Sequence, residues 1–429
     1  MIPAFVVDLA RSVGLSTVMR AAGVVTRLLP IPQPTLLVGP GASLRLGQAV
    51  NDLGHNKIMI VTDAVVAGLG LMEPMIAALQ AGGTDFIVFD DITPDAPLPL
   101  IEKGIALYQA QSCDALIAFG GGAVIDAAKA IALSVTNHKH PRQLVGYFKG
   151  RRAPAPVYAV PTTAGTGSEV TVAAVVSDPE HHRKLVIADT RLVPKMAALD
   201  PTLMAGLPPA ITAATGMDAL THAIEAFIGH WGTPYTDRMA LSAVGMIYEN
   251  LPLAYAQGHN LAAREKMALA ATYAGQAFTR ANVGYVHAIA HQFGGLYHTP
   301  HGLANAIMLP YVLRFLRPAI EPQLAALAVR AKVGAEGEPE AGLARKFLDS
   351  VDALNARLGI PRHLAALREA DIAALAQAAC READTHYPVP RYMSQQVCED
   401  VIRQALPPKA SRRKTAAKKP AVKRRVKSL

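Results

Sequence analysis

Acidic and imidazole side chains in the second half of the sequence stand at spacings that suit a metal ion. Asp218 and His222 are four residues apart, as are His287 and His291, so each pair would share one face of a helix. A further histidine, His301, follows ten residues after the second pair. A carboxylate with three neutral imidazoles suits iron, zinc, nickel or copper better than magnesium or calcium. These residues therefore predict a site for a divalent transition metal.

The prediction of a metal site depends on these residues occurring together. A single histidine is more often a satisfied core or surface residue than a ligand, and a buried imidazole needs hydrogen-bond partners. His230 and His298 carry no comparable support, and we interpret them as structural or surface residues. No cysteine lies near the group, which disfavours a structural zinc site and favours a site with a position open to substrate.

A glycine-rich turn in the first half could bind a pyrophosphate. The apolar strand Asp114–Phe119 runs into Gly120, Gly121 and Gly122, and a good helix sequence follows. Glycines let the backbone approach a ligand closely, and the helix N-terminus offers unpaired N–H groups and the positive end of its dipole. The turn lacks GxGxxG spacing, so a tight turn without a ligand explains this segment equally well.

Two further features favour a dinucleotide. The segment Pro161–Thr171, PTTAGTGSEVT, contains four threonines, a serine and two glycines, whose hydroxyl and N–H groups suit phosphate and ribose oxygens. The alternative is a polar loop capped by its own hydroxyls. Asp63 follows the strand Lys57–Thr62, where an acid can accept a hydrogen bond from a ribose 2′-hydroxyl and repel a 2′-phosphate. Asp63 thus predicts NAD(H) over NADP(H), although it could equally cap a helix.

The surrounding elements predict an α/β domain with a parallel sheet, followed by an all-α domain. In the first half, short apolar strands alternate with helical segments, as in a buried sheet built from βαβ units. The clearest strands are Thr35–Gly39, Lys57–Thr62, Asp85–Asp90 and Asp114–Phe119. Beyond Ala210 strand signals nearly vanish. Helices are expected at Ala213–Ile228, Tyr235–Asn250, Leu261–Phe278, His287–Phe293, Ala304–Leu316 and Leu343–Leu358.

The chain divides into four predicted parts. Residues 1–32 form an N-terminal extension, expected to be an amphipathic helix packed on the body. A dinucleotide-binding α/β domain covers residues 33–205, and a helical metal-binding catalytic domain covers residues 206–406. Residues 407–429 form a basic tail, whose composition predicts disorder.

Composition excludes several classes of protein. Of the 429 residues, 51% are hydrophobic and 17% are charged, which excludes wholesale disorder. Three cysteines without CxxC spacing exclude a disulfide framework and suit a reducing compartment. No apolar stretch is long enough to span a membrane, and the N-terminus lacks the pattern of a secretory signal. We therefore expect a cytoplasmic protein.

The net charge of +9 resides in the C-terminal tail. Residues 409–429 hold ten of the 42 Lys and Arg and no acid, so the rest of the chain has 32 basic and 33 acidic residues, a net charge of −1. Such a tail could bind a polyanion nonspecifically, and a solvated extension explains the same charge. The sequence has neither a groove-reading motif nor an aromatic stacking platform. A nucleic-acid-binding protein is nevertheless the alternative from a different class.

Four segments together resemble the signatures of the iron-containing (group III) alcohol dehydrogenase family. They occur in the family's order, and the similarity covers roughly residues 33–405. The segments are GGGAVIDAAKAIA, PTTAGTGSEVT, TAATGMDALTHAIEAF and HAIAHQFGGLYHTPHGLANAIMLPYVLRF. The resemblance implies a metal-dependent, NAD(H)-linked alcohol dehydrogenase or aldehyde reductase, with catalysis in a cleft between two domains. It also implies a homodimer or a larger homo-oligomer.

The functional residues of the family carry over to the matching positions of this chain. Metal ligation falls on Asp218, His222, His287 and His301. His291 falls where the family has a histidine near nicotinamide and substrate, and we expect it to relay the hydroxyl proton to solvent. Fe2+ is the expected ion, although Zn2+ suits the same ligands. Cofactor contacts fall on Asp63, Gly121, Gly122, Asp126, Thr162, Thr163, Thr166 and Lys184.

Two positions depart from the family pattern. Ala123 follows the third glycine, where the family usually has serine, so one phosphate-binding hydroxyl is missing. The family's Pro-Asn-Pro stretch appears as Pro94-Asp95-Ala96, which places an acid where an amide is usual near the adenosine side. Either change could alter cofactor binding, and neither touches the metal ligands.

Enzymes on the same type of scaffold are the nearest alternatives. A dehydroquinate-synthase-like lyase and a maleylacetate-reductase-like enzyme need Lys and Arg to hold anionic substrates, and the motif regions here are poor in both. A polyol or hydroxy-acid dehydrogenase that binds zinc through fewer side chains is closer, but all four iron-family ligand positions are filled in this chain.

Overall fold

The computed structural model describes residues 28–181 and 183–408, and seven positions between residues 14 and 24. Most of the predicted N-terminal extension (residues 1–32) and nearly all of the predicted basic tail (residues 407–429) lie outside the described residues. Among the described helices, none has the length and the apolar character that a membrane span requires.

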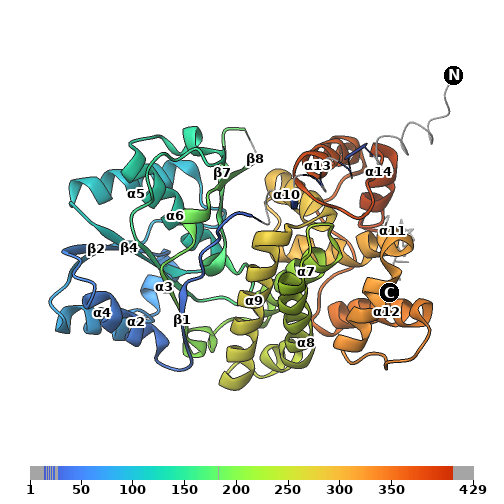
Figure 1. The fold of residues 1–429 in the computed structure, drawn as a ribbon, viewed down its shortest axis with the longest axis horizontal. Coiled ribbons are helices and arrows are strands. Elements are labelled where there is room, and N and C mark those ends of the chain that lie inside the picture. The colour runs from blue at the N-terminus through green and yellow to red at the C-terminus, as the bar shows by residue number, and fades with distance from the viewer. Residues whose placement is uncertain are drawn as a thin grey trace, which may run out of the picture.

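A six-stranded parallel sheet forms the centre of the first half (Figure 1). Its strands are β1 (Thr35–Val38), β2 (Lys57–Val61), β3 (Asp85–Phe89), β4 (Ala115–Gly120), β6 (Val157–Pro161) and β9 (Met196–Leu199). They lie in the order β1-β9-β6-β4-β2-β3, and every neighbouring pair is parallel. The predicted parallel sheet is therefore confirmed, and each of the four strands named from the sequence agrees to within one residue at either end.

Helices cover both faces of this sheet. They are α2 (Ala42–Asn51), α3 (Ala64–Gly68), α4 (Glu73–Ala81), α5 (Leu98–Ala110) and α6 (Gly122–Asn137). Successive residues of a strand face opposite sides, so Leu116 and Ala118 of β4 pack with α5 and α6, whereas Ile117 and Phe119 pack with α2 and α4. Because both faces are buried, the strands read as continuous apolar runs in the sequence.

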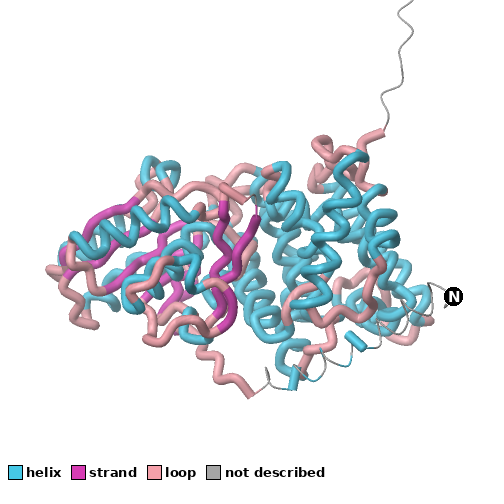
Figure 2. The backbone as a smooth tube through the Cα atoms, turned by 90° about the horizontal axis from the view of Figure 1, so that it is seen from above, coloured by secondary structure: helices cyan, strands magenta, loops and turns pink. Residues whose placement is uncertain are grey.

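A second, three-stranded sheet lies between the main sheet and the helical half (Figure 2). Its strands are β5 (Gly146–Tyr147), β7 (Ala173–Asp178) and β8 (Arg183–Ala188), in the order β5-β8-β7. β7 and β8 form an antiparallel hairpin, and β5 adds in parallel to β8. β7 and β8 fall between Val157 and Asp200, where the sequence predicts further short strands, whereas β5 precedes this region.

The second half is all-α, and the described residues after Leu199 form no strand. One apolar core joins its helices. The six helices expected from the sequence are present, and two more follow them near the C-terminal end. The helices are α7 (Pro209–Ile228), α8 (Pro234–Ala256), α9 (Leu261–Ala281), α10 (Tyr285–Tyr297), α11 (His301–Arg330), α12 (Glu340–Arg357), α13 (Ile372–His386) and α14 (Gln395–Arg403).

The two halves meet through the segment Pro161–Thr171. This segment ends in the short helix η2 (Ser168–Val170), which packs against α9. Gly167, with a positive φ of 61°, comes so close to α9 that an added Cβ would lie 2.8 Å from the carbonyl oxygen of Ala271. The proposed division between residues 205 and 206 lies in the turn between η4 (Pro201–Met204) and α7.

Candidate metal and dinucleotide site

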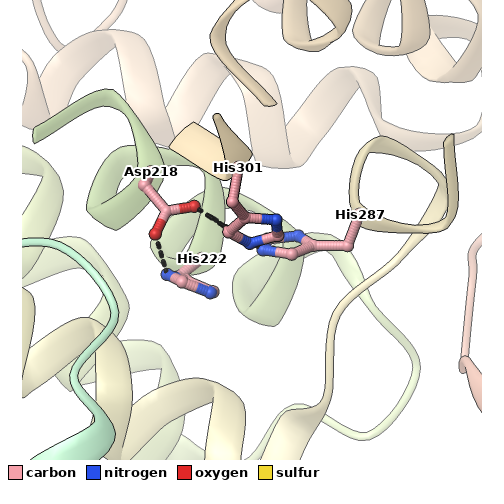
Figure 3. Close-up of side chains that lie close together, drawn as sticks. All are labelled: Asp218, His222, His287 and His301. Atoms are coloured by element: carbon pink, nitrogen blue, oxygen red, sulfur yellow. Dashed lines mark ion pairs between the residues drawn. The ribbon is translucent and has the colours of Figure 1, made fainter. Parts of the chain in front are cut away.

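Three helices bring the four predicted metal-binding side chains together. Asp218 and His222 lie one turn apart on α7, His287 lies in the first turn of α10, and His301 is the first residue of α11. Each offers one ligand atom, and these four atoms all lie within 4.8 Å of one another. Figure 3 shows the four side chains gathered around a common point.

The separations between these atoms fit a shared cation. Oδ2 of Asp218 is 3.9 Å from Nδ1 of His222. Oδ1 of Asp218 is 4.0 Å from Nε2 of His287 and 3.4 Å from Nε2 of His301. Bonds of about 2.0–2.2 Å from one ion to two ligands place those ligands about 3–4 Å apart. Nδ1 of His222 is buried without a hydrogen-bond partner, which costs free energy unless another group binds the nitrogen. The residues therefore fit a transition-metal ion.

Burial keeps the three imidazoles neutral. Asp218, His222 and His287 are at most 5% exposed. Desolvation lowers the pKa of His222 and, together with the neighbouring imidazoles, lowers the pKa of His287 well below its usual value. Desolvation also lowers the pKa of His301 to about 4, although Asp218 opposes this change. A neutral imidazole has the free lone pair that a metal ion needs.

Glu225 of α7 fixes the orientation of His287. Its carboxylate accepts a hydrogen bond from Nδ1 of His287 at 2.6 Å, and from the backbone N–H groups of Gly284 and Val286 at 2.8 Å. These N–H groups belong to the N-terminus of α10, where the helix leaves them unpaired. Burial raises the pKa of Glu225 to about 7, against the effect of hydrogen bonds from the backbone N–H groups of Gly284, Val286 and His287. Because Nδ1 of His287 donates to Glu225, its Nε2 is left to face the other ligands.

Close packing of α11 on α7 brings His301 to Asp218. An added Cβ on Gly302 would lie 2.2 Å from the carbonyl oxygen of Ala214, which is far inside van der Waals contact. Glycine is therefore required for α11 to begin directly against α7. The position of His301 follows from this contact, because it immediately precedes Gly302 in the chain.

Asn305, one turn further along α11, links the ligands to one another. Its side chain is fully buried, and its Nδ2 donates to Oδ1 of Asp218 at 2.7 Å. The same nitrogen lies 3.2 Å from Nε2 of both His287 and His301. Asn305 therefore fixes the carboxylate of Asp218 on the side where His287 and His301 lie.

His291 lies beside the four ligands but outside their group. Its ring stacks on His301 with the ring centroids 5.4 Å apart, and it meets His287 edge-on at 6.0 Å. Nδ1 of His291 pairs with Glu382 of α13 at 2.6 Å. The structure thus places His291 next to the predicted ligands, with a different carboxylate as its partner.

The two predicted dinucleotide-binding segments meet beside α7. β4 ends at Gly120 and α6 begins at Gly122, where an added Cβ would lie 2.5 Å from Cγ2 of Thr166. An added Cβ on Gly165 would lie 2.8 Å from Cβ of Thr215 on α7, the helix that carries Asp218 and His222. The glycine turn, the threonine-rich segment and the metal-binding group are therefore adjacent in space.

Buried Lys129 of α6 holds the end of the threonine-rich segment. Its Nζ donates to the carbonyl oxygens of Ser168, Thr171 and Ala173 at 2.6–3.0 Å. It also lies 3.1 Å from the hydroxyl of Ser168 and 3.0 Å from that of Thr171. Five acceptors around one ammonium group explain how a fully buried lysine is accommodated here.

Asp63 and Asp126 both make hydrogen bonds within the protein. Oδ1 of Asp63 accepts from two backbone N–H groups of α3 at 2.9 and 3.0 Å, so the helix cap considered from the sequence does exist. Oδ2 of Asp63 makes no hydrogen bond within the described residues. The two carboxylate oxygens of Asp126 accept from the hydroxyl of Ser168 at 2.5 Å and from the N–H of Val175 at 2.9 Å. Asp126 therefore supports the same segment as Lys129.

The remaining predicted cofactor residues lie on the glycine turn, the threonine-rich segment and β8. Thr162 is buried, whereas Gly121, Gly122, Thr163 and Thr166 are partly exposed. Lys184 of β8 forms an ion pair with Asp95. The acid that departs from the family's Pro-Asn-Pro pattern is therefore the partner of a predicted cofactor-binding lysine.

A second group of possible metal ligands is an ion-pair cluster. It contains Asp178, Glu180 and His181, and Asp178 is the buried member of the three. Arg142 pairs with Asp178 at 2.5 Å and with Glu180 at 2.7 Å, and His181 pairs with Asp178 at 2.8 Å. Because a guanidinium already neutralises these carboxylates, this group does not compete with the site on α7, α10 and α11.

Four supporting residues were not identified from the sequence, namely Lys129, Glu225, Asn305 and Glu382. Glu225 lies three residues after His222, and Asn305 lies four residues after His301, so the helical spacing that marked the ligands could have found both. The sequence gives no comparable signal for Glu382, which is distant from His291 along the chain.

Two family models together cover most of the chain. The model described as iron-containing alcohol dehydrogenase matches residues 33–201, and the model described as Fe-containing alcohol dehydrogenase family, C-terminal, matches residues 212–406.

Individual relatives agree with the family models. The 1,3-propanediol dehydrogenase of Klebsiella pneumoniae is 38% identical over 371 residues, which are 86% of this chain and 96% of that protein. The NAD-dependent methanol dehydrogenase of Bacillus methanolicus is 36% identical over 375 residues, which are 87% of this chain and 98% of that protein. A crystal structure of a 1,3-propanediol oxidoreductase superposes with a TM-score of 0.85 at 37% identity, and covers 88% of this chain and 100% of that one. The chain therefore belongs to the iron-containing alcohol dehydrogenase family.

Proposed function

We propose that this chain transfers a hydride between an alcohol and NAD(H), and in reverse reduces an aldehyde. The observation that supports this most directly is the group formed by Asp218, His222, His287 and His301, beside the glycine turn and the threonine-rich segment. A metal site that adjoins a dinucleotide site is what a metal-dependent dehydrogenase requires. Membership of the family, whose members oxidise alcohols, agrees with this proposal.

The group on α7, α10 and α11 would hold Fe2+, and Zn2+ suits the same donors. When bound, the ion supplies Lewis acidity that lowers the pKa of the alcohol hydroxyl. The protein contributes neutral imidazoles and one carboxylate. Glu225 orients His287, and Asn305 holds Asp218.

NAD(H) would bind where β4, α6 and the threonine-rich segment meet. When bound, its nicotinamide accepts or supplies the hydride. N–H groups at the start of α6 would bind the pyrophosphate, and the remaining oxygen of Asp63 would accept from a ribose hydroxyl. The full set proposed to contact the cofactor is Asp63, Gly121, Gly122, Asp126, Thr162, Thr163, Thr166 and Lys184, with Asp126 acting through the threonine-rich segment.

His291 would carry the hydroxyl proton toward solvent. Its Nδ1 is occupied by Glu382, and its Nε2 makes no hydrogen bond within the described residues. The side chain is 14% exposed, so the ring is held by packing but is not sealed from water. An imidazole with one nitrogen hydrogen-bonded and the other free can take up or release a proton at the free nitrogen.

The charges near the site favour an uncharged substrate. Lys184 is close enough to His301 to contribute to the lowering of that histidine's pKa, and Lys184 is already paired with Asp95. A substrate with carboxylates, such as maleylacetate, would need cations that are free to bind it. We therefore favour a small neutral alcohol or diol and the corresponding aldehyde, in line with the names of the two relatives.

Two expectations from the sequence accompany this proposal. A cytoplasmic location agrees with the three buried cysteines, none of which forms a disulfide. A homodimer or larger homo-oligomer is carried over from the family.

Substitution of a ligand tests the proposal, with a neighbouring histidine as the matched control. H287A should lower the bound iron or zinc and reduce aldehyde-dependent NADH oxidation by at least about 100-fold, because one of the four ligands is lost. H298N should retain both metal and activity, because His298 is exposed and its φ of 53° suits asparagine. Full activity of H287A without bound metal would refute the proposed use of this group.

A further inference from the structure

The proposed proton carrier His291 has its hydrogen-bond partner on α13. This helix lies outside all four signature segments. Nδ1 of His291 lies 2.6 Å from Oε1 of Glu382, which is a short, charge-assisted hydrogen-bond distance. The two residues are 91 positions apart in the chain and meet because α10 packs against α13.

Three donors converge on the carboxylate of Glu382. Besides His291, the hydroxyl of Tyr387 donates to Oε1 at 2.5 Å, and Nε2 of Gln292 donates to Oε2 at 2.9 Å. Tyr387 is buried, and Gln292 follows His291 on α10. An ionised carboxylate accepts hydrogen bonds and donates none, so it satisfies all three donors at once.

The surroundings keep Glu382 ionised. Burial acts to raise its pKa, but the charge of His291 and the hydrogen bonds from His291 and Tyr387 outweigh burial, and the pKa of Glu382 is lowered. The same carboxylate adds to burial in raising the pKa of Tyr387 well above its usual value, so Tyr387 remains a donor. Glu382 is therefore the acceptor in all three of these hydrogen bonds.

This acceptor role determines which nitrogen of His291 is free. A carboxylate at Nδ1 can only accept, so Nδ1 must carry a proton, and the neutral ring then has its lone pair on Nε2. An amide in place of the carboxylate could instead donate to Nδ1 and reverse the tautomer.

We propose that Glu382, held by Tyr387 and Gln292, is a positioning residue that fixes the ring and the tautomer of His291 so that Nε2 exchanges the proton of the alcohol. The inference rests on the proposed function, because it assigns Glu382 a role in the proton transfer of that reaction. Glu382 acts through His291 and does not itself contact the reacting atoms.

The direct test compares E382Q with E399Q, a control that removes one glutamate charge from the neighbouring helix α14. E382Q should lower kcat for aldehyde reduction by about 10- to 100-fold, with metal content and the KM for NADH unchanged. It should also increase the solvent deuterium isotope effect and decrease the isotope effect of deuterated NADH, because the proton step becomes slower than the hydride step. E399Q should behave like the unaltered chain.

A double-mutant cycle separates positioning from general structural damage. If Glu382 acts only through His291, the double variant H291N/E382Q should be no slower than H291N alone. The inference would be overturned if the decreases in kcat of the two single variants multiply in the double variant. It would also be overturned if the kcat of E382Q is within threefold of the unaltered chain, or if E382Q loses its metal.

If the proposed function is wrong, the unaltered chain will not reduce aldehydes with NADH, and this result is distinct from those above. In that case the Nδ1–H proton of His291 still tests the inference in zinc-loaded protein with 15N-labelled histidine. The inference predicts a strongly deshielded signal that is present in E399Q and lost in E382Q. Its persistence in E382Q would overturn the assignment of Glu382.

Discussion

At the scale of single residues, Asp63 combines a structural role with a proposed cofactor contact. Its Oδ1 caps α3, and its Oδ2 makes no hydrogen bond within the described residues. The sequence offered helix cap and ribose contact as alternatives, but one carboxylate has two oxygens, and the structure leaves one for each role. A variant that separates them must keep the cap and remove the charge.

D63N makes this separation, because asparagine caps helices about as well as aspartate. We expect D63N to keep the melting temperature and to shift the ratio of kcat/KM for NADPH over NADH upward by about 10- to 100-fold, since a charged acceptor for the ribose hydroxyl and a repulsion of the 2′-phosphate are both lost. D63A, which loses the cap as well, should be destabilised by about 1 kcal/mol. An unchanged cofactor ratio in D63N would leave Asp63 as a helix cap alone.

The grouping of the predicted metal-binding residues could be anticipated from the sequence, because an i, i+4 spacing of carboxylate and imidazole survives folding into a helix. Asp218 and His222 do lie one turn apart on α7. The choice of His301 over His291 as the fourth member came from the family resemblance, and in the structure it depends on the contact of Gly302 with α7. Such a contact between helices has no local pattern in the sequence.

At the scale of elements, Lys129 connects α6 to the segment that is proposed to bind NAD(H). Five acceptors from Ser168, Thr171 and Ala173 surround its ammonium group. The sequence gives no sign of this role for Lys129, because a charged residue within a helix is normally exposed. Only the folded structure shows that the segment after β6 passes over this face of α6.

K129M should destabilise the protein and weaken NADH binding together. Removing the ammonium leaves buried acceptors without a donor and leaves Asp126 and Glu169 without a neighbouring cation, so we expect a loss of about 3–5 kcal/mol in the free energy of unfolding. Denaturant unfolding and an NADH fluorescence titration measure the two effects. K103M, which removes an exposed lysine of α5, is the control and should change neither. Normal NADH affinity in K129M would contradict the proposed support of the cofactor segment.

The same lysine predicts a dependence of stability on pH. Burial lowers the pKa of Lys129 from 10.5 to about 8, against the effects of Asp126 and Glu169. Between these pH values the unfolded chain binds the proton and the folded chain releases it, so stability should rise with pH, by up to about 3 kcal/mol. K129M lacks this contribution, so the unaltered chain should gain stability relative to K129M as the pH rises from 8 toward 10.5. If the difference in the free energy of unfolding between the unaltered chain and K129M instead decreases over this pH range, the hydrogen bonds keep Lys129 protonated in the folded chain.

Elements with a strong apolar pattern were predictable, and those defined mainly by tertiary contacts were not. β2 and β4 are buried on both faces, so their apolar runs are plain in the sequence. The helices α13 and α14 were not predicted, and α14 is short, with nine residues. α13 supplies Glu382, so this omission also concealed the partner of His291.

At the scale of the whole molecule, the proposed reaction depends on two halves with different architectures. The two halves lie side by side in Figure 1. The sheet half presents the glycine turn and the threonine-rich segment, and the helical half presents the four proposed ligands and His291. Glycines at 165 and 167 allow the sheet half to approach α7 and α9 within van der Waals contact. The basic tail lies outside the described residues, and its role as a solvated extension or a polyanion-binding segment stays a prediction.

The central claim is that the four side chains on α7, α10 and α11 hold a metal ion on which turnover depends. The most direct measurement is elemental analysis of the purified protein, combined with NADH oxidation by a panel of aldehydes before and after chelation. We expect about one iron or zinc ion per chain, activity that is lost on chelation, and recovery on addition of Fe2+. Metal-free protein that retains full aldehyde reductase activity would contradict a role of the metal ion in turnover.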